Sequence, residues 1–489
     1  MKSKRFFSML LAVLSMAGLM AACGGGDTAS DSKADSSAGS TASKEADSKA
    51  DDSSEADDKA DSEAEGSDEV YTINFYAWTA PENVVQLLDE FNKEYEGKYV
   101  MEYQKLADAA TMTINTALAS GESIDVMTQA NAFDLRTRYD GGTYLGLNQF
   151  LEKDGENYKE IFGDTFDKVY NFEDDYYAVP YCNNQFMMFF NKKMFDEAGE
   201  PYPEPDWTWD DFREKAERLT SGEGANKVYG AMIDFGKPDV DMFWAGIAQQ
   251  KLGEFWYYND DFTATKFDAP EMKESLDFFY NLSNDGFIVP LDEYTALQYD
   301  SDTVAMNGLY SDKFAMYACP VYGCLYLNEN YGEVPEGTDI GMTNIPRPAD
   351  VENPTTITYS STASIPTSSK NPEAAWTALR YICIDHAELF DGPKANLPAY
   401  SFKTEEEAND FYDIVFSGHP GLDYDMCMEI MALPRDQVSK DNTIVQGQMK
   451  IKELINANIP MVFNGEMTVD EALADFKEKG DQFIADDLG

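Results

Sequence analysis

The stretch Ala178–Thr220, AVPYCNNQFMMFFNKKMFDEAGEPYPEPDWTWDDFREKAERLT, sets the interpretation of the whole chain. Phe186–Phe190 is a continuous apolar run between polar residues, which predicts a strand buried on both faces. A short helical segment then ends at Gly199, and a proline-rich connection follows, in which no helix can continue. Thr208, followed three residues later by Asp211, predicts a capping box that opens an amphipathic helix.

Upstream of this stretch, strand and helix patterns alternate. Val70–Thr79 alternates in polarity, which predicts a strand with one buried face. A helix is expected next, with its apolar stripe at Val84, Val85, Leu88 and Phe91. Strand, helix, strand, helix and strand at this spacing predict an α/β fold with a parallel sheet. Ligands of such sheets bind beyond the carboxyl ends of the strands.

The composition limits the classes of ligand. The chain has 489 residues, 43% of them hydrophobic, which predicts more than one domain with large cores. Its formal net charge is −53. Because such a surface repels nucleic acid and anionic lipid, we exclude nucleic-acid binding and peripheral membrane docking. Neutral and cationic ligands are favoured.

The first 69 residues are expected to lie outside the folded part. Basic residues precede the apolar run Phe6–Ala22, and residues 1–22 therefore predict a secretory signal; a spanning helix is the alternative, for which the run is short. Leu19–Cys23 (LMAAC) resembles a bacterial lipobox, which implies lipidation of Cys23. Residues 23–69 are acidic and of low complexity, which predicts a disordered tether.

Cysteine and histidine provide no metal or cofactor signal. Apart from Cys23, five cysteines remain, and an odd number argues against a full disulfide framework. Cys319 and Cys324 either pair or are small buried residues, and we favour the second interpretation. The only histidines, His386 and His419, lie far apart in the chain, and no cluster has the spacing of a zinc site. We expect neither a metal nor a cofactor.

Several blocks carry a family resemblance. They are SGESIDV (120–126), AVPY (178–181), FNKKMF (190–195), WTWDDF (207–212), SKNPEAAW (369–376) and GEMTVDEAL (465–473). In this order and spacing they resemble the extracellular solute-binding proteins of family 1, the sugar-binding components of ABC importers related to maltose-binding protein. The resemblance covers residues 70–489.

The resemblance implies a two-lobe periplasmic-binding-protein fold of type II, in which hinged lobes each hold a sheet flanked by helices. Lobe 1 would comprise residues 70–179 and 338–371, and lobe 2 residues 180–337 and 372–489. It also implies a monomer on the extracytoplasmic face of the cell membrane, attached only through its lipid. The partners would be a small-molecule ligand and the permease subunits of an ABC transporter.

The resemblance further implies ligand contacts at strand ends and at a predicted hinge. These residues are Trp78, Glu82, Gln129, Asn131, Tyr181, Asn184, Asp239, Asp241, Trp244, Tyr322 and Tyr359. Some have alternative interpretations: Trp78 as a core residue, Glu82 as a charge that complements a helix N-terminus, and the two aspartates as helix caps. Asn184 is neutral where the maltose-binding relatives have an acid, which puts maltose itself in doubt.

Three functions remain at this point. The first is capture of a neutral mono- or oligosaccharide for an ABC importer. The second is binding of a polyamine or another small solute on the same fold, because aromatic and acidic residues together suit cations. The third is a surface glycan-degrading enzyme with paired carboxylates. Since no nucleophile motif, phosphate loop or metal cluster is present, we expect a binding protein and no enzyme.

Overall fold

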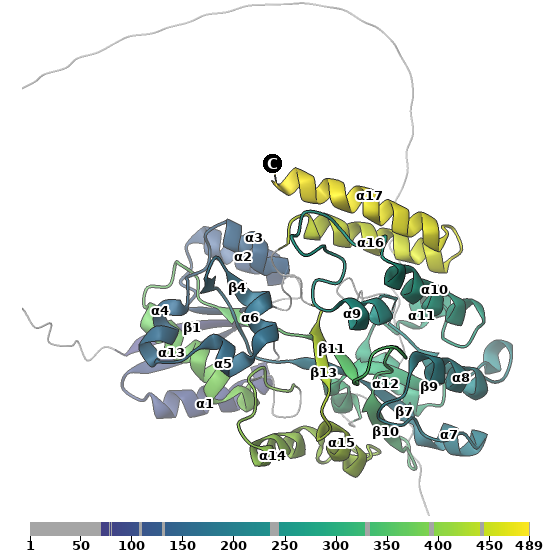
Figure 1. Ribbon diagram of the computed structural model, residues 1–489. Coiled ribbons are helices and arrows are strands. Elements are labelled where there is room, and N and C mark those ends of the chain that lie inside the picture. Colours follow the sequence, from purple (N-terminus) through teal and green to yellow (C-terminus); the bar gives the residue numbers. More distant parts are fainter. Residues whose placement is uncertain are drawn as a thin grey trace, which may run out of the picture. The chain divides into compact units, whose positions relative to one another are not determined.

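Two mixed sheets and their flanking helices organise the chain (Figure 1). The computed structural model describes residues 70–77, 79, 81–106, 110–129, 133–234, 244–327, 333–390, 396–440 and 445–488. No helix within these ranges is both long and apolar enough to cross a membrane. The mixed α/β class expected from the sequence is confirmed.

The first sheet is parallel at one edge and antiparallel at the other. In spatial order it contains β2 (Tyr99–Lys105), β1 (Tyr71–Ala77), β3 (Val126–Gln129), β12 (Thr362–Ser364) and β6 (Val179–Pro180). β1 pairs in parallel with β2 and β3, as the alternating pattern predicted. β12 runs antiparallel to both β3 and β6. The carboxyl ends of β1 and β3 therefore share one edge of the sheet.

Helices cover this sheet and enclose one core. They are α1 (Val85–Glu94), α2 (Ala110–Ser120), α3 (Phe133–Asp140), α4 (Asn148–Asp154), α5 (Tyr158–Phe162), α6 (Asp164–Tyr170) and α13 (Pro372–Arg380). A two-stranded ladder, β4 (Asn171–Phe172) with β5 (Asp175–Tyr176), follows α6. Ile73, Phe75 and Ala77 all point into this core, which confirms the predicted buried face of β1.

The predicted apolar stripe of α1 is wrong at two positions. A 3₁₀ turn, Pro81–Asn83, precedes the helix, so that α1 itself begins at Val85. Leu87 is buried in place of Leu88, and Val85 is 52% exposed. The extra turn rotates the helix relative to the phase expected for a helix that starts at Pro81.

The second sheet is built on the strand predicted from the apolar run. Its order is β13 (Asp436–Ser439), β11 (Thr355–Tyr359), β7 (Asn184–Asn191), β9 (Phe314–Pro320) and β8 (Tyr229–Met232), with β10 (Ile340–Asn344) also paired to β7. Every residue of β7 is buried, as predicted. β7 runs antiparallel to β9, β10 and β11. The sheet separates two apolar cores, one on each face.

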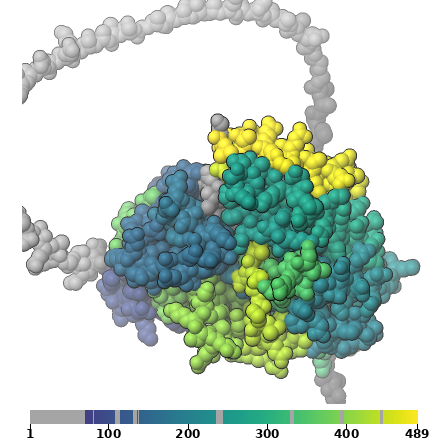
Figure 2. Space-filling view, in the orientation of Figure 1, coloured from purple at the N-terminus to yellow at the C-terminus, as the bar shows by residue number. Residues whose placement is uncertain are grey.

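Helices of the second sheet come from the middle and from the C-terminal part of the described chain. They are α7 (Lys192–Ala198), α8 (Trp209–Leu219), α9 (Gly246–Leu252), α10 (Pro270–Asn284), α11 (Leu291–Leu297), α12 (Asp302–Tyr310), α14 (Glu405–Phe416), α15 (Tyr424–Met431), α16 (Gln448–Phe463) and α17 (Val469–Leu488). The capping box of Thr208 and Asp211 at α8 is confirmed. Figure 2 shows α17 in yellow over teal surface, where α16 and α17 share a core with α10.

The chain crosses between the two sheets through short segments that lie side by side. Residues 181–183 join β6 to β7, and residues 360–361 join β11 to β12. The two segments are hydrogen-bonded to each other, since the amide of Tyr181 donates to the carbonyl of Ser361 at 3.0 Å. We call these residues, with the strand ends on either side, the crossing.

The cores divide the chain at positions other than the expected 338 and 372. β10 and β11, expected in lobe 1, pair with β7 in the second sheet. α13, expected in lobe 2, places Ala375 and Leu379 in the first core. The reason is that the chain enters the first sheet only at β12 and remains on it through α13, so that the crossing lies at residues 360–361.

Candidate ligand-binding site

Three buried amide side chains meet the crossing, and each has a polar atom without a partner among the described residues. They are Gln129 at the end of β3, Asn183, and Asn184 at the start of β7, and each is at most 6% exposed. Their unpartnered atoms are Nε2, Oδ1 and Oδ1 respectively. Because a buried polar atom without a partner costs roughly 1–3 kcal/mol, such atoms indicate a site built for a ligand or for water.

The other atom of each amide is held in place. Oε1 of Gln129 accepts hydrogen bonds from Thr362 Oγ1 at 2.7 Å and Ser364 Oγ at 3.3 Å. Asn183 Nδ2 donates to Gln437 Oε1 at 2.7 Å, and Asn184 Nδ2 contacts the Cys182 sulfur at 3.3 Å. One end of each amide is thus fixed by neighbouring strands, while the other end keeps its hydrogen-bonding capacity.

A chain of hydroxyl groups lies beside these amides. Tyr359, which pairs with Asn184 across β11 and β7, donates to the hydroxyl oxygen of Tyr322 at 3.2 Å. Tyr322 in turn donates to Asp302 Oδ2 at 3.2 Å, and Tyr317 donates to the other oxygen of Asp302 at 3.3 Å. A carboxylate thereby orients three phenols. The arrangement can hydrogen-bond a polyhydroxylated ligand or accept a cation.

Burial raises the pKa of both Tyr322 and Tyr359 well above the usual range of a phenol. Each ring nevertheless keeps part of its surface accessible. Both hydroxyls therefore remain protonated at neutral pH and act as donors. The ring of Tyr359 also has Phe186 at 5.9 Å between centroids and the Lys440 ammonium 4.6 Å from its own centroid, which reduces the face open for stacking.

The structure gathers five of the residues expected at the site and separates two others. Gln129, Tyr181, Asn184, Tyr322 and Tyr359 lie at or beside the crossing. Tyr181 is 4% exposed and packs edge-on against Phe390.

The two separated residues are Trp244 and Glu82. Trp244 is 5% exposed and packs with Trp256 and Phe476 in the core of the C-terminal helices. Glu82 is exposed in the 3₁₀ turn beyond the carboxyl end of β1. Trp78, Asn131, Asp239, Asp241 and Cys23 lie outside the described residues.

Asp302, Asn183 and Lys440 are additions that the sequence did not single out as contacts. Asp302 is the first residue of α12, where an acid is usually interpreted as a charge that complements the helix dipole. Nothing in the local pattern connects it with Tyr322, which follows 20 positions later. Asn183 offered the one usable signal, because a second amide stands next to Asn184 in the predicted hinge.

The described residues contain no group of acids, histidines or cysteines that could hold a metal. All five cysteines among them are buried thiols outside any disulfide, which confirms the interpretation of Cys319 and Cys324 as small buried residues. Desolvation raises the pKa of the Cys383 thiol well above its ordinary value, so this thiol is protonated at neutral pH.

Solved structures with the same fold are known. The chain resembles an ABC substrate-binding protein from Listeria monocytogenes in complex with cycloalternan, with 20% identity, a TM-score of 0.66, and coverage of 85% of this chain and 100% of that one. The sugar-binding protein MalE from Xanthomonas citri has 18% identity, a TM-score of 0.66, and coverage of 85% and 98%. UgpB from Mycobacterium tuberculosis, in complex with glycerophosphocholine, has 14% identity, a TM-score of 0.67, and coverage of 86% and 100%.

No curated protein sequence matches the chain. The model of one protein family does, over residues 77–382, a span that contains β1, the crossing and α13. The two-lobe fold of the structural neighbours agrees with the two sheets joined at the crossing. The chain therefore belongs to the bacterial extracellular solute-binding proteins.

Proposed function

We propose that the protein is the lipid-anchored solute-binding component of an ABC importer, and that it binds a neutral mono- or oligosaccharide at the crossing. The observation that carries the proposal is the set of three buried amides at the crossing, Gln129, Asn183 and Asn184, each with one polar atom that has no partner among the described residues. Amides beside phenols are suited to sugar hydroxyls, which both donate and accept hydrogen bonds.

The structural neighbours support this ligand class in part. The Listeria protein holds cycloalternan and the Xanthomonas protein is a sugar-binding protein, whereas the Mycobacterium protein holds glycerophosphocholine. At this low sequence identity the neighbours support the fold alone, so the ligand class is inferred from the residues of the site. Uncharged amides together with protonated phenols favour a neutral polyhydroxylated solute.

A polyamine or another small cation is the second candidate. Tyr322 and Tyr317 both donate hydrogen bonds to the Asp302 carboxylate, an arrangement of acid and aromatic rings that suits an ammonium group. The net charge of −53 attracts such a ligand as well.

A ligand panel tests the proposal. The full chain is screened by thermal shift against maltose, cyclic and linear glucans, mannose oligosaccharides, putrescine and spermidine. We expect at least one saccharide to raise the melting temperature in a saturable way, because a ligand that binds only the folded state stabilises it. If only the amines raise it, the sugar proposal fails and the polyamine candidate replaces it. Release of new reducing ends from a glucan would contradict the absence of catalysis.

The lipid anchor is tested separately. Cells that express the full chain or its Cys23→Ala variant are fed an alkyne-labelled fatty acid. We expect label and membrane association only with Cys23 present, because two or more acyl chains are needed for stable anchoring. Label on the Cys23→Ala variant would contradict the proposed anchor without affecting the ligand proposal.

A further inference from the structure

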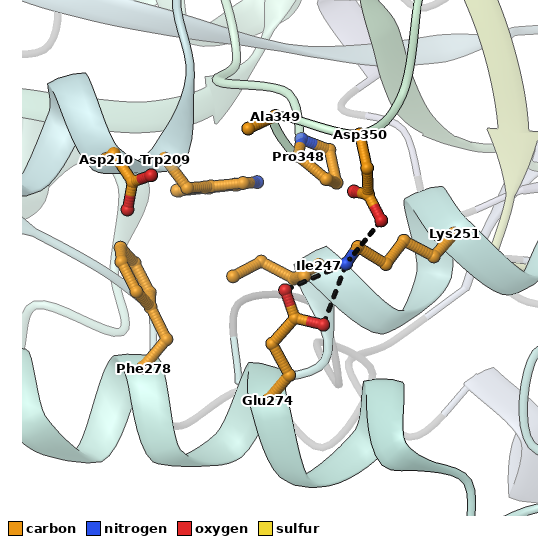
Figure 3. Close-up of a pocket in the computed structure, with 9 residues that line it drawn as sticks. All are labelled: Trp209, Asp210, Ile247, Lys251, Glu274, Phe278, Pro348, Ala349 and Asp350. Atoms are coloured by element: carbon orange, nitrogen blue, oxygen red, sulfur yellow. Dashed lines mark hydrogen bonds and ion pairs between the residues drawn. The ribbon is translucent and has the colours of Figure 1, made fainter.

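A pocket lies away from the crossing, among α8, α9, α10 and the loop between β10 and β11 (Figure 3). Its volume is about 470 Å³, within the range of small-ligand pockets. The loop leads into β11 at Thr355, whereas the crossing begins after Tyr359 at the other end of that strand. At roughly 3.3 Å per residue the two strand ends are on the order of 13 Å apart. The pocket is therefore a separate site.

The floor of this pocket is apolar and rigid. Trp209 and Ile247 form it and are each 3% exposed, and the half-buried ring of Phe278 closes one side. Trp209 is fixed by its indole N–H, which donates to Gln250 Oε1 at 2.8 Å. Because so little of the indole is accessible, it provides no open ring face on which a sugar could stack. The floor is suited to a narrow aliphatic stem.

The rim is acidic. Glu274 and Asp350 both hold the Lys251 ammonium, at 2.7 and 3.0 Å, and Asp210 stands on the opposite side beside Phe278 (Figure 3). Although burial opposes the charge of Lys251, the hydrogen bonds that its ammonium donates to Glu274 and Asp350 raise its pKa, so this lysine stays charged. The rim thus holds three carboxylates and one ammonium, which leaves an excess of negative charge.

We propose that this pocket binds an organic cation, a guanidinium or ammonium group on an aliphatic stem. The stem would lie against the half-buried ring of Phe278, above the floor formed by Trp209 and Ile247, while the charged head would remain at the rim between Asp210 and Asp350. Long basic side chains bury their stems and keep their heads at the surface in this way. The acidic rim disfavours an anion, and the buried indole of Trp209 gives a sugar ring no open aromatic face. The ligand would be either a free alkylamine or a basic side chain of a partner protein.

Fluorine NMR on the full chain labelled with 5-fluorotryptophan tests this proposal, because Trp209 lies in the floor. The Trp209→Phe variant identifies its resonance among the six tryptophans of the chain. The probes are butylguanidinium and the blocked dipeptide acetyl-Leu-Arg-amide. The matched neutral probe is acetyl-Leu-citrulline-amide, which has the same shape without the charge.

We expect the charged probes to shift the Trp209 resonance in a saturable way that weakens with added salt. The shift should be lost when the charge is removed from the probe. The arginine dipeptide should bind at least tenfold more tightly than the citrulline dipeptide, and Asp350→Asn and Asp210→Asn should each weaken it several-fold. Exposed acids on β2 and in the turn before it provide the control variant Glu102→Gln with Glu96→Gln, which should change nothing. Melting temperatures establish that each variant is folded.

Two results would overturn the proposal: equal binding of the citrulline and arginine dipeptides, or an unmoved Trp209 resonance at millimolar probe. Equal affinities of butylguanidinium and the arginine dipeptide would support a free alkylamine as the source of the cation. Tighter binding of the dipeptide would support a side chain of a partner protein. None of these outcomes depends on which solute binds at the crossing.

Discussion

The hydroxyl oxygens of Tyr359 and Tyr322 lie 3.2 Å apart, although the two residues belong to different segments of the second sheet. Tyr359 ends β11, next to the crossing, and Tyr322 lies in the 3₁₀ segment Val321–Tyr326 after β9. Since Tyr322 donates its own proton to Asp302, its oxygen is left to accept the proton of Tyr359. The Asp302 carboxylate therefore sets the direction of both hydrogen bonds, from Tyr359 to Tyr322 and from Tyr322 to Asp302.

Removal of the middle hydroxyl should weaken ligand binding. The Tyr322→Phe variant leaves Tyr359 without its acceptor, and we expect about a tenfold loss of affinity for the ligand found in the panel, together with about 1 kcal/mol of stability. Isothermal titration calorimetry and urea unfolding measure the two effects. Tyr310→Phe is the matched control, because the Tyr310 hydroxyl is buried without a partner among the described residues and is not at the crossing. An unchanged affinity in Tyr322→Phe would exclude this chain of hydroxyls from the site.

Substitution of two buried amides, Asn184 and Asn191, should have opposite effects on ligand affinity and on stability. We expect Asn184→Ala to lower ligand affinity at least tenfold with little loss of stability, because its Oδ1 has no partner to lose in the free protein. Asn191→Ala should do the reverse, since Asn191 donates to the carbonyl of Leu309 at 2.9 Å and caps α7. Calorimetry and thermal unfolding of both variants make the comparison. Parallel losses in the two variants would contradict a ligand role for Asn184.

Stability should fall at alkaline pH. Burial raises the pKa of Tyr71, Tyr381 and Tyr400 from 10.0 to about 12, and Asp125 adds to the effect at Tyr71. Below pH 10 both the folded and unfolded states keep these protons, whereas between pH 10 and pH 12 mainly the unfolded state loses them. The melting temperature should therefore drop through this window. A Tyr381→Phe variant should show a shallower drop, and an identical slope would contradict the assignment.

An ion pair connects the two cores. Lys168 at the end of α6 lies 3.6 Å from Glu254, which follows α9, and their side chains are 56% and 18% exposed. A double-mutant cycle with Lys168→Met and Glu254→Gln should give a coupling of about 0.5 kcal/mol that declines with salt. Because the pair spans two cores, breaking it should change ligand affinity about twofold.

The matched control for this pair lies within one core. Lys153 and Glu373, on α4 and α13, are 2.5 Å apart, and their side chains are 60% and 56% exposed. Breaking that pair should leave ligand affinity unchanged. If breaking either pair changes ligand affinity equally, the effect comes from the altered net charge of the protein and does not depend on a connection between the two cores.

Gly230 should not tolerate a side chain. A Cβ on this residue of β8 would lie 2.0 Å from the carbonyl oxygen of Ala216 on α8, and backbone cannot move aside cheaply. We expect Gly230→Ala to cost about 3 kcal/mol in the free energy of unfolding. Gly246→Ala is the control, because its nearest contact would be an ordinary 3.7 Å from Trp209. Chemical denaturation of both variants measures the difference, and a stable Gly230→Ala would show that α8 can shift.

The sequence predicted well wherever the structure depends on neighbours in the chain. The apolar run of β7, the stop at Gly199 and the capping box at Thr208 each involve only a few residues, and all three are confirmed. α1 shows where this local reasoning ends. A single 3₁₀ turn moved the buried position from Leu88 to Leu87, and the pattern of apolar residues allowed both phases.

Features that depend on contacts between residues distant in the sequence could not be predicted from local patterns. The crossing at residues 360–361 depends on which strand β11 pairs with, and α13 packs on a sheet whose first strand lies about 300 residues earlier. The contact of Trp244 with Phe476 also joins segments far apart in the chain, and an isolated tryptophan near a predicted rim carried no sign of it.

The sequence by itself determined the α/β class, the main local elements and the family, because each rests on short-range patterns or on ordered blocks. Only the tertiary structure decided which polar groups meet. In it, Tyr322 donates a hydrogen bond to Asp302, and one atom of Asn184 has no partner among the described residues. Lys251 forms ion pairs with two carboxylates from separate elements. Hydrogen bonds and charges act over a few ångströms, so their partners are set by packing and can lie anywhere along the chain.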